Sequence, residues 1–127
     1  MKKLILEGSA KTPYIEFDPE KKYILIKGRS IPENSIEFYQ PLIDRIENLG
    51  GENSSNYKVD IQLEYFNTSS SKCILDIFKK LEKINNNTNN IKITWYYEED
   101  DEDMLEAGED YQSIINLPFN MVEIANN

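Results

Sequence analysis

Alternation of apolar and polar positions is the clearest pattern in this 127-residue chain, and it is most regular between residues 57 and 66. Every second residue there is apolar, from Tyr57 to Tyr65, which is the period of a strand with one buried face. Further β-prone runs lie at residues 4–7, 14–18, 23–28, 91–99 and 119–125. Turn residues between the runs 14–18 and 23–28 predict that these two form a hairpin.

Three other segments carry apolar residues at helical spacing. The first begins with Asn34 and Glu37 in the arrangement of a capping box. Pro41 must either kink this helix or mark its true first turn. The second follows a run of hydroxyl-bearing residues, and the third follows a run of acids. The predicted helices cover residues 34–49, 69–84 and 104–116.

The resulting order of elements is β-β-β-α-β-α-β-α-β. Helices that alternate with strands imply crossover connections and therefore a partly parallel sheet. The N-terminal hairpin adds antiparallel strands to it. We predict an α/β fold with a mixed sheet and about three helices, formed by residues 1–127 as a single domain.

Charge and composition exclude several classes of function. The formal net charge is -9, so the averaged field repels nucleic acid and anionic membrane surfaces. There is no histidine and a single cysteine, Cys73, which excludes a Cys/His zinc site and catalytic schemes that need imidazole. The first apolar run is too short for a signal peptide or a membrane span, so we expect a cytoplasmic protein with no membrane insertion.

The stretch YFNTSSSK, residues 65–72, joins the most regular strand to the second helix. The helix can begin at any of four residues, since Asn, Thr and Ser are all good N-caps: Asn67, Thr68, Ser69 and Ser70. A phosphate-binding loop is a poor alternative, because the turn has no glycine. A site of phosphorylation is a better one, because a helix N-terminus tolerates an added anion.

Six consecutive acids, Glu98 to Asp103, follow the aromatic residues Tyr96 and Tyr97. They predict a solvated loop or the start of a helix, where the dipole favours acids. Two functional alternatives remain open. The aromatics and acids could form a recognition edge for a basic partner. A small metal-dependent hydrolase could instead use Asp100, Asp101 and Asp103, although the spacing matches no calcium loop.

The segment GRSIPEN, residues 28–34, joins a strand to the first helix. Arg29 is the natural cation to meet a phosphate on Thr68 if the sheet brings the two together. The sequence alone does not establish that proximity.

Six segments of the chain resemble the SiaC family of bacterial regulatory phosphoproteins. They are TPYIEFD (12–18), GRSIPEN (28–34), FYQPL (38–42), YFNTSSSK (65–72), WYYEEDDEDMLEAGEDY (95–111) and LPF (117–119). They come in the family's order and span about residues 12–124. The resemblance implies a fold like the STAS domains of anti-sigma-factor antagonists. It also implies a regulator that is not an enzyme and that needs no cofactor or metal.

The resemblance further implies that Thr68 is phosphorylated by a dedicated protein kinase (SiaB-like) and dephosphorylated by a PP2C-type phosphatase (SiaA-like). The unphosphorylated form would bind and activate a diguanylate cyclase (SiaD-like), in cyclic di-GMP signalling that controls biofilm formation. A general adaptor in which Thr68 is only a helix cap is a further alternative. The expected contact residues are Arg29, Asn67, Ser69, Ser70, Ser71, Lys72, Tyr96, Tyr97, Glu98, Glu99, Asp100 and Asp101.

Overall fold

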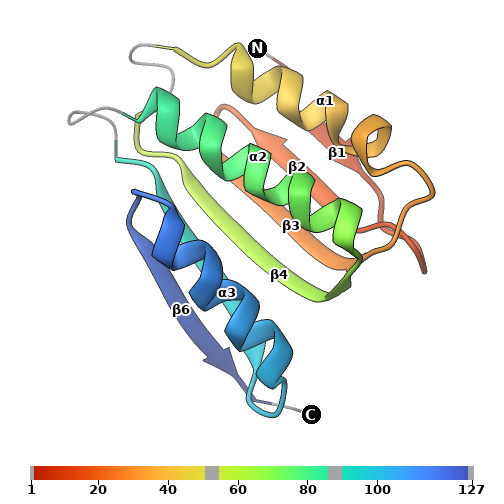
Figure 1. Cartoon of the computed structure of the whole chain (residues 1–127). Helices are drawn as coiled ribbons and strands as arrows, with labels where there is room; N and C mark the ends of the chain where they lie inside the picture. The colour runs from red at the N-terminus through yellow and green to blue at the C-terminus, as the bar shows by residue number, and fades with distance from the viewer. Residues whose placement is uncertain (1, 51–54, 86–89, 126–127) are drawn as a thin grey trace.

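The computed structural model describes residues 2–50, 55–85 and 90–125, and within them the elements follow the predicted order (Figure 1). The strands are β1 (Leu4–Leu6), β2 (Tyr14–Asp18), β3 (Tyr23–Ser30), β4 (Lys58–Phe66), β5 (Lys92–Glu98) and β6 (Phe119–Ile124). The helices are α1 (Ser35–Glu47), α2 (Thr68–Ile84) and α3 (Glu102–Ile114). The predicted α/β class, with its mixed sheet and three helices, is confirmed.

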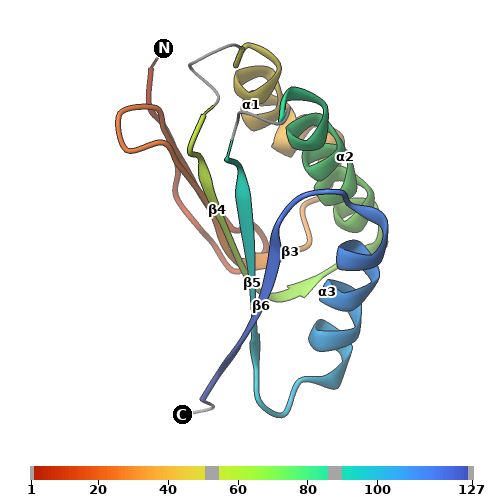
Figure 2. The same ribbon diagram turned by 90° about the vertical axis from the view of Figure 1, so that its left-hand side faces the viewer.

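The strands form one sheet in the order β1-β2-β3-β4-β5-β6. The pairs β1–β2 and β2–β3 are antiparallel, and the pairs from β3 to β6 are parallel. Each helix connects two neighbouring parallel strands. Successive crossovers of the same hand place their helices on the same face, and Figure 2 shows all three helices on one side of the sheet.

The alternation of the central strand β4 breaks near its end. Gly28 pairs with Leu63, but the next residue of β3, Arg29, pairs with Tyr65, so the register shifts at Glu64. The extra residue turns Tyr65 outward, and 51% of this side chain is exposed. The prediction that Tyr65 continues the buried face is therefore wrong, because an irregularity in pairing overrides the period of two.

The core lies between the sheet and the helices, and its largest fully buried side chain is Trp95 of β5. The indole N–H donates to the backbone oxygen of Met104, at 3.0 Å, which fixes α3 against β5. Gly108 of α3 makes this close packing possible. A Cβ added there would lie 2.5 Å from Cδ1 of Trp95, so the helix would have to move away from the sheet.

Helix α1 begins as the capping box predicts. The side chain of Asn34 accepts a hydrogen bond from the backbone of Glu37 at 3.1 Å, and the Asn34 amide donates to the Glu37 carboxylate at 3.4 Å. Pro41 lies inside this helix and not in its first turn, so that alternative is wrong.

Candidate functional site

The junction between β4 and α2 is capped by an amide and not by a hydroxyl. The strand ends at Phe66, and the Asn67 side chain accepts from the backbone N–H of Ser70 at 2.9 Å. Thr68 is the first residue of the helix. Thr68 is therefore not the N-cap, because Asn67 fills that position. The adaptor alternative, in which Thr68 is not phosphorylated, stays a prediction.

Beneath the junction lies a cluster of hydrogen-bonded hydroxyls that joins β3, α1 and α2. Ser70 is fully buried and donates to the backbone oxygen of Ser30 at 3.0 Å. The Ser30 hydroxyl donates back to the Ser70 hydroxyl at 2.8 Å and shares a 2.6 Å bond with Tyr39. Ser35 bonds the hydroxyls of Ser69, at 2.7 Å, and of Ser70, at 3.3 Å. The cluster satisfies the buried polar atoms at this end of the sheet.

Sequence reasoning missed three members of this cluster, Ser30, Ser35 and Tyr39. Ser30 and Ser35 flank the segment between β3 and α1, where serine is an ordinary turn or helix-start residue. Their burial depends on the parallel pairing of β3 with β4, which no local pattern reports. The prediction that Ser70 contacts a partner is wrong, because its side chain lies entirely inside the protein.

Thr68 differs from its hydroxyl-bearing neighbours. Ser69 donates to Asn67 at 3.2 Å, and Ser71 donates to the backbone oxygen of Thr68 at 2.7 Å. The Thr68 side chain is exposed, and its hydroxyl makes no hydrogen bond to any residue that the structure describes. Of the four hydroxyls of the junction, that of Thr68 is therefore the one that is accessible and can be modified without breaking a hydrogen bond within the protein.

Three groups near the junction, Tyr39, Cys73 and Tyr111, have pKa values raised above their ordinary values. Burial raises the pKa of Tyr39 far above its ordinary value. Burial, with a smaller contribution from the charge of Asp76, raises the pKa of the Cys73 thiol. Tyr111 donates to the backbone oxygen of Ser71 at 2.9 Å, and burial raises its pKa as well. An activated nucleophile needs an oriented base, and these groups supply none.

Arg29 belongs to β3 and not to a loop, and its guanidinium lies over the ring of Tyr65, 5.7 Å from the centroid. Its side chain lines a hollow of about 230 Å³ together with Tyr96, Tyr97 and Glu98. The structure therefore brings together four of the predicted contact residues from two strands. This geometry gives no support to the expected contact between Arg29 and Thr68, because the guanidinium is engaged elsewhere.

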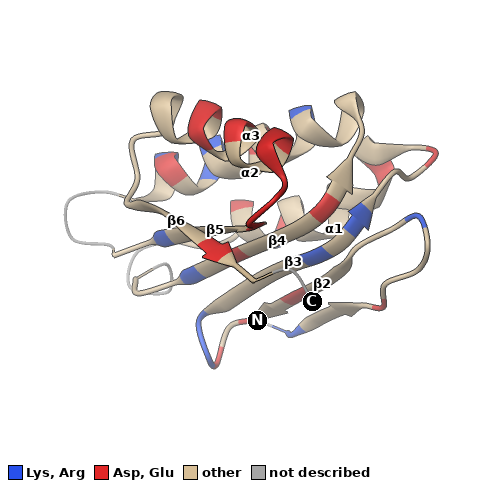
Figure 3. Ribbon diagram, turned by 90° about the horizontal axis from the view of Figure 1, so that it is seen from below, with Lys and Arg blue, Asp and Glu red and all other residues tan. Residues whose placement is uncertain are grey.

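The acidic run begins helix α3. Asp101 is the N-cap and accepts from the backbone of Met104 at 3.0 Å, while Glu102 and Asp103 occupy the first turn. Figure 3 shows these acids gathered at the start of α3. This is the placement that the helix dipole favours.

The geometry of the acidic run gives no support to the metal-dependent hydrolase. Within residues 2–50, 55–85 and 90–125, no group of three or more acidic or cysteine side chains could hold a metal ion. The Asp101 carboxylate instead caps α3, because it accepts a hydrogen bond from the backbone N–H of Met104.

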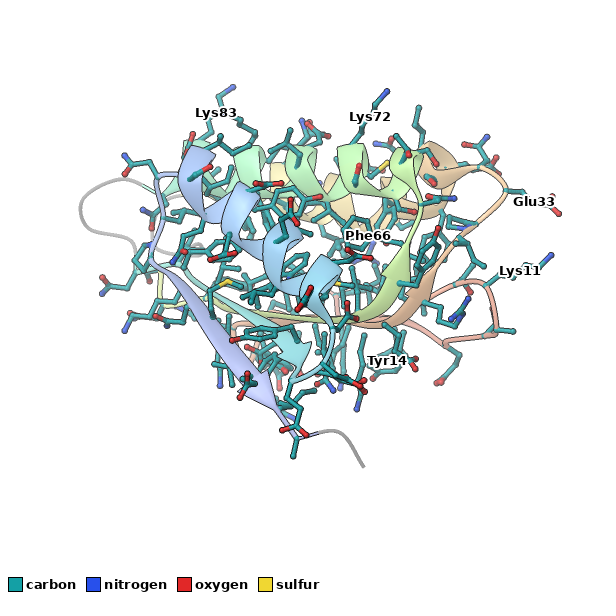
Figure 4. The ribbon with its side chains drawn as sticks, turned by 60° about the horizontal axis from the view of Figure 1, so that its bottom comes forward. Lys11, Tyr14, Glu33, Phe66, Lys72 and Lys83 are labelled. Atoms are coloured by element: carbon teal, nitrogen blue, oxygen red, sulfur yellow. The ribbon has the colours of Figure 1, made fainter. Side chains whose placement is uncertain are left out.

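Lys72 follows Thr68 by one helical turn and is exposed. Figure 4 shows Lys72 and Lys83 pointing into solvent from opposite ends of α2.

Among the helices of the described ranges, none has the length and apolar character that crossing a membrane requires.

Comparisons with known proteins find similar sequences. The family model described as SiaC family regulatory phosphoprotein matches residues 6–124. An uncharacterized protein of Pseudomonas aeruginosa is 30% identical over 119 residues, which cover 94% of each chain.

Solved structures are also similar. SiaC of Pseudomonas aeruginosa superposes with a TM-score of 0.89 and 28% identity, covering 98% of this chain and 100% of that one. A crystal structure of the diguanylate cyclase SiaD in complex with its activator SiaC, from the same organism, contains a chain with a TM-score of 0.89 and 29% identity. The match covers 95% of this chain and 99% of that one. The likeness to STAS domains stays a prediction.

Proposed function

Because the chain belongs to the SiaC family of regulatory phosphoproteins, we propose that it binds and activates a diguanylate cyclase under the control of its own phosphorylation. As a member of that family it is a regulator and not an enzyme. The complex of SiaD with its activator SiaC supports the choice of partner, since this chain is similar to SiaC over nearly its whole length.

The observation that carries the proposal is the exposed hydroxyl of Thr68. A kinase must reach its acceptor oxygen, and phosphorylation must not cost the fold an internal hydrogen bond. A kinase cannot reach the Ser70 hydroxyl, because this residue is buried. Ser69 and Ser71 are each held by a hydrogen bond within the junction. Thr68 meets both conditions, and we assign it as the phosphorylated residue.

A phosphate on Thr68 changes the surface and leaves the fold in place. It adds a charge of roughly -1.5 to -2 and three acceptor oxygens. The positive end of the α2 dipole favours an anion in the first turn of the helix. The phosphate therefore weakens binding to the cyclase through steric and like-charge effects, and the unphosphorylated protein is the active form.

The proposal includes two further partners, a SiaB-like protein kinase and a SiaA-like PP2C-type phosphatase. Their opposing activities set the fraction of protein that can activate the cyclase, and so the level of cyclic di-GMP that controls biofilm formation. Both the ATP used by a kinase and the GTP used by a cyclase are cytoplasmic nucleotides. We therefore place the protein in the cytoplasm.

Intact-mass spectrometry tests the acceptor residue. Incubation with the SiaB-like kinase of the same organism and ATP is expected to add one phosphate to the wild type and none to Thr68→Ala. The matched control is Ser71→Ala, which removes a hydroxyl one turn away and should still gain the phosphate. A phosphate on Thr68→Ala would contradict the assignment.

A further inference from the structure

The two edges of the sheet are protected unequally. Strands β1 and β6 are its outer strands, and Figure 1 shows β6 at one margin of the molecule. Strand β1 has three residues and directly follows Lys2 and Lys3, and both short length and lysine discourage pairing with another chain. Strand β6 has six residues and contains neither lysine nor proline. The edge of β6 is therefore open to an added strand.

The backbone of β6 uses only one of its two sides. The Ile124 oxygen accepts a hydrogen bond from the N–H of Glu99, directly after β5, at 3.0 Å. Alternate residues of a strand bond to the same neighbour, so Val122 also faces β5. Met121 and Glu123 direct their N–H and C=O groups outward. These outward groups have no hydrogen-bond partner in the part of the chain that the structure describes.

A contact with α3 supports this orientation of the strand. Phe119 is also an odd-numbered residue of β6, and its backbone oxygen accepts from the side chain of Gln112 at 2.8 Å. Helix α3 thus satisfies the first outward carbonyl and leaves the next two residues open. What remains is a short row of donors and acceptors at the outer side of Met121 and Glu123, which is the template that β-strand addition uses.

Carboxylates border this row on the helix side of the sheet. Since Gln112 reaches the edge, the residues three and ten positions before it, Glu109 and Glu102, lie along the same side of α3. Met121 packs beneath α3, and Glu123, two residues later, points to the same face. All three glutamates are exposed, and none forms an ion pair with a residue that the structure describes.

We propose that the edge of β6 receives an extended, basic segment of a partner protein as a seventh strand. Side chains of such a segment alternate between the two faces of the sheet. Those on the helix face meet Glu102, Glu109 and Glu123, which select lysine or arginine. Those on the other face lie beside Val122 and Ile124, which select β-branched apolar residues. The segment that fits therefore alternates basic and apolar residues.

A second copy of the chain fits this edge poorly. Two β6 edges brought together would place the same glutamates of both copies beside each other, in chains that each carry a net charge of -9. The inference goes beyond the proposed function and does not depend on it. Strand β6 and α3 form the edge, whereas Thr68 begins α2 after β4.

A synthetic peptide of sequence Thr-Lys-Val-Lys-Val-Lys-Thr is the probe, and the same peptide with glutamate for lysine is its counterpart. The wild type is expected to bind the lysine peptide at least tenfold more tightly in fluorescence polarisation. Amide hydrogen exchange followed by NMR should slow at Met121 and Glu123 and stay unchanged at Val122, which already bonds to β5. Equal binding of the two peptides, no binding of either, or unchanged exchange at Met121 and Glu123 overturns the proposal.

Substitutions test the backbone and the charges separately. Met121→Pro removes an outward N–H at a position where an edge strand tolerates proline, and should weaken peptide binding at least tenfold, whereas Met121→Leu should bind like the wild type. The double variant Glu102→Gln, Glu109→Gln should bind severalfold more weakly and with less dependence on salt. Its control, Glu20→Gln with Glu33→Gln, removes the same charge from two exposed positions outside β6 and α3 and should bind like the wild type.

Thermal denaturation first establishes that each variant folds. If Met121→Pro does not fold, the exchange pattern and the charge variants decide the matter. If the control for the charges weakens binding as much as the α3 double variant, the attraction is a property of the net charge and the edge is not the site. If light scattering shows a dimer of the protein alone that Met121→Pro abolishes, the edge joins two copies and the basic segment is excluded.

Discussion

At the scale of single residues, the hydroxyls of YFNTSSSK divide into one that is free and three that hold structure. Thr68 is exposed without a hydrogen bond, while Ser70 is buried between β3 and α1. The sequence placed this stretch correctly at a strand-to-helix junction. The local pattern could not rank the four hydroxyls, because Ser and Thr are all good N-caps and their burial is set by neighbours far away along the chain. Only the resemblance to a family singled out Thr68.

Replacing Ser70 separates structure from regulation. Ser70→Ala leaves the backbone oxygen of Ser30 and the Ser30 hydroxyl without their buried partner, so we expect a loss of about 1–3 kcal/mol in the free energy of unfolding. Thr68→Ala removes an exposed hydroxyl and should change this free energy by less than about 0.5 kcal/mol. Urea unfolding of the two variants measures both changes in free energy. Equal effects of the two substitutions would contradict the hydrogen-bonded cluster.

At the scale of elements, the sequence predicted the strands, the helices and the capping box of α1 from local patterns. It did not predict the bulge at Glu64, because a register shift is a property of two paired strands. It also left open where Pro41 lies in the helix, since the residue suits both a first turn and a kink. The structure decides this, because Asn34 caps the helix at Ser35 and Pro41 therefore lies inside it.

The contact between α3 and β5 predicts the effect of adding one methyl group. In Gly108→Ala the new Cβ clashes with Trp95 and with the Met121 side chain, at 2.5 and 2.6 Å. Since the indole is fixed by its bond to Met104, we expect a loss of about 1–3 kcal/mol in unfolding free energy. Trp95 fluorescence during urea denaturation measures this loss in unfolding free energy. Gly50→Ala, with no atom within 4 Å of the new Cβ, serves as the control and should unfold like the wild type.

The turn between β2 and β3 predicts a dependence of stability on pH. The backbone N–H of Lys21 holds the pKa of Asp18 below its ordinary value of 3.8, aided by that of Glu20 and by the charge of Lys3. A lowered pKa stabilises the fold above the ordinary value and loses this effect as pH falls through the folded value. Asp18→Asn should therefore lower the urea midpoint most at pH 6 and progressively less below pH 3.8. An equal difference at pH 6 and pH 3 would contradict this assignment.

At the scale of the whole molecule, the parallel half of the sheet builds the site. Strands β3 and β4 end at the same edge, where the backbone of Asn67 donates to the oxygen of Ser30 at 3.0 Å. That edge and the N-terminal ends of α1 and α2 together carry the junction and the exposed Thr68. The regulation that we propose at Thr68 would therefore act on a surface and not on the core.

A negative charge at Thr68 should accordingly change association without changing folding. We expect Thr68→Asp to bind the cyclase at least tenfold more weakly than Thr68→Ala, with thermal transitions that agree within about 2 °C. Calorimetric titration and thermal denaturation measure the two quantities. Equal binding by both variants would disprove the switch, and a lost thermal transition would show that phosphorylation controls folding.

The sequence by itself determined the order of the elements, the capping box of α1 and the likeness to a regulatory family, because period, turn chemistry and motif are local properties. It also excluded imidazole chemistry through composition. Only the tertiary structure decided which hydroxyl of the junction is free and that the acids begin helix α3. Burial and proximity arise when distant segments pair, and parallel pairing brings together residues that no local pattern links.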